Sequence, residues 1–281
     1  MLSRLAPRLR LIVLTTFVMT GFAANSVLCR LALRGDHMDP AGFTSLRIAS
    51  GALSLWLLVS LGGKKRVGGD WGSALALAAY AITFSFAYVS LTVGTGALLA
   101  FGAVQASMLI GGLLAGERLK PVQTAGLILA LGGLVYLVLP GVAAPTPLGA
   151  TLMLAAGVAW GVYSLRGRGV NAPALATAGN FLRALPLVVA VSLPFLREMH
   201  ADAMGVAYAI VSGAVTSGLG YVIWYAVMRE LSVTQAAVVQ LSAPVIAALG
   251  GVLLGEALTL RLVLASVAIL GGIACVVTSR R

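Results

Sequence analysis

Charge is what this sequence has least of. Only 10% of the 281 residues are charged, whereas a soluble domain carries about 25%. Hydrophobic residues make up 60% of the chain, and the mean hydropathy is +1.02. A water-soluble fold cannot bury that much apolar surface. The composition therefore excludes an ordinary soluble protein and predicts a membrane protein.

Cysteine and histidine are almost absent as well. Both cysteines, Cys29 and Cys275, fall in apolar stretches, so they indicate neither a disulfide framework nor a metal site. The two histidines, His37 and His200, fall in short polar joints. We therefore expect no metal and no cofactor.

Long apolar runs dominate what is present. They are about 20 residues long, the length that a helix needs to cross the hydrocarbon core. Nothing shows the alternating pattern of a barrel, so the sequence predicts an all-α polytopic membrane protein. The ten predicted transmembrane helices are 9–32, 41–62, 71–91, 95–115, 120–140, 147–166, 174–196, 203–228, 234–254 and 259–278.

Cations predict the orientation of these helices. With a cytoplasmic N-terminus, thirteen of the 19 lysines and arginines lie on the inner side and four on the outer side, while Arg47 and Arg183 lie inside spans. The positive-inside rule then places both termini in the cytoplasm of a multi-pass protein of the cell inner (plasma) membrane. The cations are spread over many loops rather than gathered on one face, which argues against nucleic-acid binding.

The chain also contains an internal repeat. A shift of 139 residues places Gly116-Glu117 on Gly255-Glu256 and Gly132-Gly133 on Gly271-Gly272. In the first two spans the shift is 136, and it pairs Arg30 with Arg166 and Arg47 with Arg183. Residues 1–142 and 143–281 thus form two five-helix repeats, and an odd number of spans makes them inverted, as in secondary transporters. Removing Met1 to Ala24 as a secretory signal would break this symmetry.

The repeat gives the two glutamates a structural role. Glu117 and Glu256 follow the fourth helix of each half, on opposite sides of the membrane, so they cannot share one catalytic centre. We expect each to cap exposed amides at the start of the next helix.

Several of these features resemble the drug/metabolite transporter superfamily, in its EamA-like branch. They are the five-helix halves, the Gly-Glu joints, Trp160-Gly161, and an arginine in the second helix of each half. The resemblance covers the whole chain and is greatest to bacterial aromatic amino acid exporters. The first half departs from the pattern, with Ala24 and Asn25 where Trp-Gly is usual, so the halves need not contribute equally to a site.

Acids are missing from the predicted spans. All eight lie at span ends or in loops, and an ionisable residue inside a membrane is usually functional. No carboxylate is placed to bind a coupling proton or a dicationic drug. This favours a neutral or zwitterionic substrate moving by facilitated diffusion, although an antiporter that exchanges substrates would have the same sequence features.

Polar and aromatic residues at mid-span are the candidates for substrate binding. Tyrosine and tryptophan combine an apolar body with one hydrogen-bonding group, and an amide in lipid costs free energy unless it faces protein or a wet cavity. The candidates are Asn25, Tyr80, Phe84, Phe101, Gln105, Trp160, Tyr163, Ser217, Tyr221, Trp224 and Gln240.

Each candidate also has a plain structural interpretation. Aromatics in membrane helices often pack or anchor at the interface, and amides can join helices. Arg47 or Arg183 could pair with a substrate carboxylate, or each could extend to the interface or bond helix-end carbonyls.

The sequence as a whole predicts an exporter of small neutral or zwitterionic metabolites, most of all aromatic or other hydrophobic amino acids, by alternating access through a central cavity. A carrier of a sugar derivative or drug-like compound is the alternative, followed by a channel or an intramembrane enzyme. Ser217 begins a Ser-Gly-Leu-Gly turn, but no span supplies a histidine to activate it, so we expect no catalytic residues. The partners expected are the substrate and membrane lipid, for a monomer or homodimer.

Overall fold

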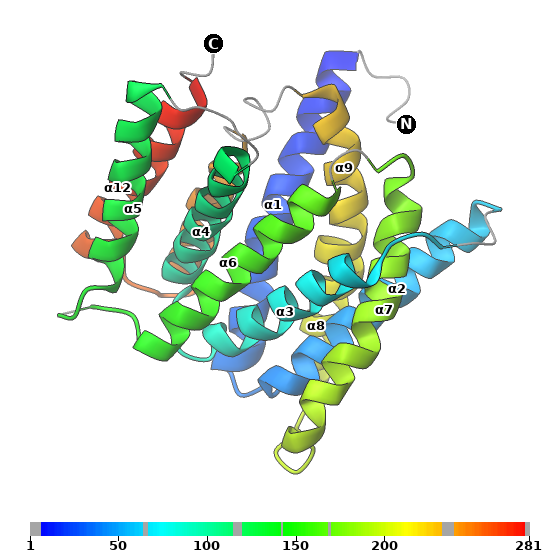
Figure 1. Ribbon diagram of the computed structural model, residues 1–281. Helices are drawn as coiled ribbons and strands as arrows, with labels where there is room; N and C mark the ends of the chain where they lie inside the picture. The colour runs from blue at the N-terminus through cyan, green and yellow to red at the C-terminus, as the bar shows by residue number, and fades with distance from the viewer. Residues whose placement is uncertain are drawn as a thin grey trace.

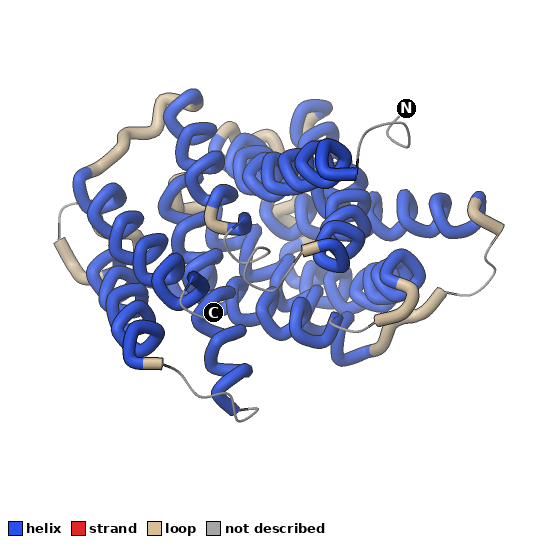
Figure 2. The backbone as a smooth tube through the Cα atoms, turned by 90° about the horizontal axis from the view of Figure 1, so that it is seen from above, coloured by secondary structure: helices blue, strands red, loops and turns tan. Residues whose placement is uncertain are grey.

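The described part of the chain is helical. The computed structural model describes residues 7–63, 67–114, 120–141, 143–167, 170–231 and 239–278. Within these ranges there is no β-strand, only one antiparallel bridge between Met38 and Ala201 (Figure 2). The helices are α1 Pro7–Arg34, α2 Pro40–Leu61, α3 Trp71–Tyr88, α4 Val93–Leu114, α5 Pro121–Val138, α6 Pro147–Gly167, α7 Pro173–Ser192, α8 Ala203–Val211, α9 Gly220–Glu230, α11 Ser242–Leu253 and α12 Leu260–Thr278.

Two short segments of other helix types continue these helices. A 3₁₀ turn, Leu193–Phe195, extends α7, and a π-helical segment, Ser212–Leu219, joins α8 to α9. The stretch from α8 to α9 is therefore one long helix with a wide turn in its middle.

Eight of the described helical stretches are long and apolar enough to cross a membrane. The apolar parts of the last two helices, Ser242–Leu253 and Leu260–Cys275, are shorter. Many large apolar side chains on the outer faces are exposed, such as Ile128, Leu264 and Val267. The protein is thus a multi-pass membrane protein, and the ten crossings remain a prediction for the two shorter helices.

Acids at the helix starts satisfy amides that have no partner within the helix. The side chain of Asp39 accepts a hydrogen bond from Gly42 N at 2.7 Å, Asp70 from Ser73 N at 3.0 Å, and Asp202 from Gly205 N at 2.8 Å. Proline occupies the first position of α2, α5, α6 and α7, where its missing N–H is not needed. Short capped joints of this kind separate the helices.

Most of the main helix pairs join residues of the first half to residues of the second. α5 packs on α12, α3 and α4 pack on α6, and α2 packs on α7 (Figure 1). In the α5–α12 pair a side chain at Gly133 would meet Ala268 and Ile269 at 2.9 Å, whereas Gly132 and Gly271 have open space beside them. Small residues thus let these helices approach closely. The described start of α1 and end of α12 lie at the same end of the bundle (Figure 1).

Candidate substrate-binding site

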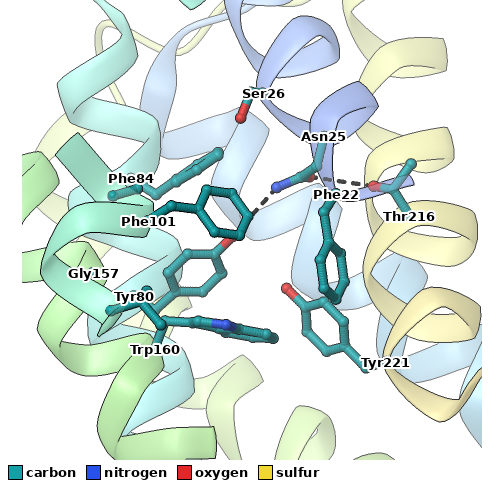
Figure 3. Close-up of a pocket in the computed structure, with 12 residues that line it drawn as sticks. Phe22, Asn25, Ser26, Tyr80, Phe84, Phe101, Gly157, Trp160, Thr216 and Tyr221 are labelled. Atoms are coloured by element: carbon teal, nitrogen blue, oxygen red, sulfur yellow. Dashed lines mark hydrogen bonds between the residues drawn. The ribbon is translucent and has the colours of Figure 1, made fainter. Parts of the chain in front are cut away.

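A central cavity lies where α1, α3, α4, α6 and the π-helical segment meet (Figure 3). Its volume is about 30 Å³, which is room for one or two water molecules. Six of its lining residues are among the sequence candidates: Asn25, Tyr80, Phe84, Phe101, Trp160 and Tyr221. The other six were not predicted: Phe22, Ser26, Ala100, Val104, Gly157 and Thr216.

Trp160 is the centre of the aromatic wall. Its ring centroid lies 4.6 Å from that of Tyr221, 5.0 Å from Tyr80 and 5.5 Å from Tyr163. Phe22 meets Trp160 edge-on at 6.1 Å. Trp160 is only 8% exposed. These packed rings make one face of the cavity almost wholly aromatic.

Asn25 is the polar centre of the opposite wall. Its Oδ1 accepts hydrogen bonds from Ser212 Oγ at 2.7 Å and Thr216 Oγ1 at 3.3 Å. Its Nδ2 donates to the hydroxyl of Tyr80 at 3.3 Å (Figure 3). The amide thus ties α1 and α3 to the π-helical segment, and its polar atoms are satisfied at the cavity wall.

Arg47 lies directly behind this wall. The residue is 1% exposed. Its Nε donates to Ser217 Oγ at 3.2 Å, and its Nη2 donates to Tyr80 Oη at 3.2 Å. Its guanidinium carbon is 5.2 Å from the ring centroid of Tyr80 and 5.1 Å from that of Phe84. Its Nη1 is buried and has no hydrogen-bond partner in the part of the chain that the structure describes. The prediction that Arg47 extends to the interface or bonds helix-end carbonyls is therefore wrong.

Arg183 bonds backbone carbonyls, one in the joint before α3 and one in the second turn of α7. Its Nη1 donates to the carbonyl of Gly68 at 2.7 Å and to the carbonyl of Gly179 at 2.9 Å. It is half-buried, and it fastens the segment before α3 to α7.

Five sequence candidates lie outside the cavity lining. Tyr163 and Trp224 are buried and pack behind it, on Trp160 and Phe22 respectively. The Ser217 hydroxyl accepts a hydrogen bond from Arg47 Nε. Gln240 is buried elsewhere in the bundle. Gln105, one helical turn beyond Phe101, has a buried Nε2 with no hydrogen-bond partner within the described ranges.

A second cavity, of about 200 Å³, lies between α3, α6, α7 and α9. Asp70 and Arg166 line it, and Arg166 Nη2 donates to Asp70 Oδ1 at 2.6 Å. Hydrogen bonds from Ser73, together with Arg166, hold the pKa of the Asp70 carboxyl well below its usual range. Tyr163 and Asn180 also line this cavity, so Tyr163 lies between the two cavities.

Glu256 departs from its predicted role. Its Oε2 accepts a hydrogen bond from Val93 N at 2.7 Å, and its Oε1 accepts one from Arg30 Nε at 3.3 Å. It therefore caps the start of α4 rather than that of α12, because the joint after α11 folds back against the other half. Glu117, its partner in the repeat, lies outside the described residues.

Comparison with known proteins agrees with this architecture. Residues 147–278 match the model of the EamA-like transporter family. An uncharacterized protein of Pseudomonas aeruginosa, PA1977, is 50% identical over 98% of this chain and 96% of its own length. The chain belongs to the EamA-like transporter family. It is therefore a transporter-family protein, and an enzymatic role finds no support in that family.

More distant relatives of this EamA-like protein carry functional names. An uncharacterized transporter of Archaeoglobus fulgidus is 26% identical over 86% of this chain and 90% of its own length. A probable terminal-alkyne amino-acid exporter of Streptantibioticus cattleyicolor is 29% identical over 65% of this chain and 63% of its own length. One crystal structure, at 24% identity, covers 95% of this chain and 99% of its own with a TM-score of 0.66, which shows a shared fold.

Two of the unpredicted lining residues had a detectable signal. Phe22 lies three residues before Asn25 and four before Ser26, so helical spacing places Phe22 on one face of α1 with each of them. Thr216 lies in an ordinary-looking apolar stretch, and only the π-helical turn places it beside Asn25.

Proposed function

We propose that this protein exports small neutral or zwitterionic metabolites, above all aromatic and other hydrophobic amino acids, across the cell inner membrane. The observation that carries the proposal is the central cavity, whose aromatic and amide wall comes from both halves of the chain. Transporters commonly bind substrate at such a midplane junction. The name of the Streptantibioticus relative supports an amino acid as the substrate.

The architecture we propose for transport is the predicted one. Residues 1–142 and 143–281 are inverted five-helix repeats, α11 and α12 complete ten crossings, and both termini lie in the cytoplasm. The protein works as a monomer or homodimer in the lipid bilayer. A cavity of about 30 Å³ is too small for an amino acid, so the substrate enters only after the helices around it move, as alternating access requires.

Facilitated diffusion is the proposed energetic mode. Among the described residues every acid caps a helix, ends one, or lies in a joint. None borders the central cavity, and the cavity walls therefore offer no carboxylate for a coupling proton.

Counterflow into proteoliposomes tests the proposal. Purified protein is reconstituted, preloaded with one unlabelled amino acid, and exposed to labelled phenylalanine, tyrosine, tryptophan or leucine in turn. We expect exchange of the aromatic and large aliphatic amino acids. Exchange of a sugar derivative in their place would make the substrate assignment wrong, and loss of transport on collapsing a pH gradient would show proton coupling.

A matched pair of tryptophan variants connects transport to the cavity. Trp160→Ala removes the centre of the aromatic wall, whereas Trp56→Ala removes an indole that is 47% exposed on the outside of α2. We expect Trp160→Ala to reduce counterflow at equal amounts of folded protein and Trp56→Ala to leave it unchanged. Equal rates in both variants would contradict a role for the cavity.

A further inference from the structure

We propose that the Tyr80 hydroxyl, backed by the charge of Arg47, is a binding subsite for the carboxylate of the transported molecule. The inference rests on the proposed function, because it concerns the same cavity, and it adds the chemical class of the substrate. Tyr80 contacts the ligand, and Arg47 is the positioning residue behind it.

The hydrogen bonds from Asn25 and Arg47 occupy the acceptor lone pairs of the Tyr80 hydroxyl and leave its proton for another partner. A hydroxyl has two acceptor lone pairs and one proton to donate. Asn25 Nδ2 and Arg47 Nη2 both donate to Tyr80 Oη, at 3.3 and 3.2 Å. Arginine can only donate, and the Asn25 amide is held in this orientation because its Oδ1 accepts from Ser212. The tyrosine can therefore only donate to a further partner. In this structure the Tyr221 hydroxyl interacts with it, and a carboxylate that enters the cavity is a stronger acceptor than that hydroxyl.

The charge behind Tyr80 has no counter-ion within the described residues. Arg47 is 1% exposed, and the ion pairs of these residues involve other arginines and histidines. A buried charge without a partner is energetically costly. Two aromatic rings and two neutral hydroxyls offset only part of that cost, and Nη1 has no hydrogen-bond partner among the described residues. An anionic group that enters the cavity supplies the missing charge.

The remaining walls fit the rest of an amino acid or aryl acid. Trp160 and Tyr221 form an apolar surface across the cavity from Asn25, and Phe22 extends toward them from the Asn25 side (Figure 3). Hydrogen-bond chains polarise one another, so a carboxylate on the Tyr80 hydroxyl also feels the guanidinium behind it. A ligand with a carboxylate at one end and an apolar body at the other satisfies both walls.

The experiment compares four probes that share a phenyl ring on a two-carbon chain, on the purified full-length protein. L-Phenylalanine and 3-phenylpropionate carry a carboxylate, whereas L-phenylalaninamide and 2-phenylethylamine do not. Thermal unfolding in detergent measures binding, because a ligand that binds the folded state raises the unfolding temperature. The buffer salt is sulfate, and a chloride arm tests whether a simple anion occupies the subsite. We expect the two carboxylates to bind at least about tenfold more tightly than the other probes, as loss of a charged hydrogen bond predicts.

Three variants separate the subsite from mere packing. Tyr80→Phe keeps the ring and removes the hydroxyl, and Arg47→Gln removes the charge. Both should lose the preference for carboxylates by about tenfold or more while still binding the apolar body. Arg183→Gln, the matched control, should keep the wild-type preference. The comparison of probes on the wild type stands even where a variant does not fold.

The outcomes distinguish the two proposals. Equal stabilisation by carboxylate and carboxylate-free probes, or an unchanged preference in Tyr80→Phe and Arg47→Gln, would overturn the subsite and leave the carrier proposal standing. Stabilisation by chloride equal to that by the carboxylates would also overturn the subsite. Failure of all four probes to bind or to exchange would overturn the amino-acid assignment itself, and the subsite with it.

Discussion

Arg30 in α1 and Arg166 in α6 are paired by the predicted repeat, and each binds an acid from the other half. Arg30 bonds Glu256 at 3.3 Å, and Arg166 bonds Asp70 at 2.6 Å. Arg47 and Arg183 are paired by the same shift, yet their contacts have nothing in common.

The difference teaches where the two halves have diverged. Arg183 bonds two backbone carbonyls near a helix end, which any repeat copy could do. Arg47 is buried among Tyr80, Phe84 and Ser217 beside the cavity. Contacts near the ends of the helices are alike in the two halves, whereas contacts beside the cavity are not. A substrate with a single carboxylate needs only one such cation beside the cavity.

The largest effect should come from replacing Arg47 and Arg183 by glutamine, one at a time. Without the Arg47 charge, a substrate carboxylate loses its partner, and we expect counterflow to fall at least about tenfold. Arg183→Gln should stay within about twofold of wild type, because a glutamine amide can still donate to Gly68. Rates are compared per amount of reconstituted protein. A similar loss in both variants would remove the functional contrast between the two positions.

The second-largest effect should come from the two ion pairs Arg30–Glu256 and Arg166–Asp70. The Arg30 and Glu256 side chains are 13% and 7% exposed, whereas those of Arg166 and Asp70 are 47% and 51% exposed. Removing one partner of a buried pair costs about 3–5 kcal/mol, and an exposed pair contributes about 0–1 kcal/mol. Glu256→Ala should therefore lower the unfolding temperature far more than Asp70→Ala. Equal decreases would show that burial does not distinguish the two pairs.

Replacing Arg47 or Arg183 by methionine should give a smaller contrast, seen in the thermal stability of the protein. Arg47→Met removes an unpaired buried charge, so we expect the ligand-free protein to unfold at the wild-type temperature or above. Arg183→Met leaves the Gly68 carbonyl without its side-chain donor and should cost about 1 kcal/mol. Thermal unfolding without substrate measures both. A clear loss of stability in Arg47→Met would mean that its neighbours compensate the charge fully.

The smallest effect is one of pH. Because its folded-state pKa lies below the ordinary value of 3.8, the Asp70 carboxylate stabilises the protein above that pH, and the contribution is lost as the pH falls below it. Asp70→Asn should be slightly less stable than wild type at pH 7, and the two should converge under acid. Thermal unfolding from pH 7 to pH 3 checks this. A constant difference would assign the effect to capping rather than charge.

The sequence predicts much of the fold because apolar length and charge position are local properties. The span boundaries agree with the helices to within a few residues for most elements, such as 71–91 against Trp71–Tyr88. Capping by Asp39 and Asp70 needs only the next turn of helix. Glu256 was assigned to the wrong helix because its partner, Val93, comes from the other half.

The site was predictable only in part, because its contacts join residues that lie far apart in the sequence. Asn25, Tyr80 and Trp160 stand out as polar or aromatic residues at mid-span, and they meet at the cavity. Arg47 lies about two turns inside its span, and its depth alone cannot distinguish a side chain that turns outward from one that turns inward. Its burial depends on the hydroxyl groups of Ser217 and Tyr80, which are supplied by other helices.

The π-helical segment Ser212–Leu219 has a consequence for the ancestry of the two halves. The offset between them is 136 at Arg183 and 139 at Gly255, and this segment lies in that interval. A π-turn holds more residues than an α-turn, so residues gained inside a span can remain there as a bulge. Each residue of an α-helix turns the chain by about 100°. Deleting one residue from the bulge should therefore restore an ordinary α-turn and leave Tyr221 facing the cavity, whereas deleting one residue from a regular turn of α8 would rotate α9 by about that angle.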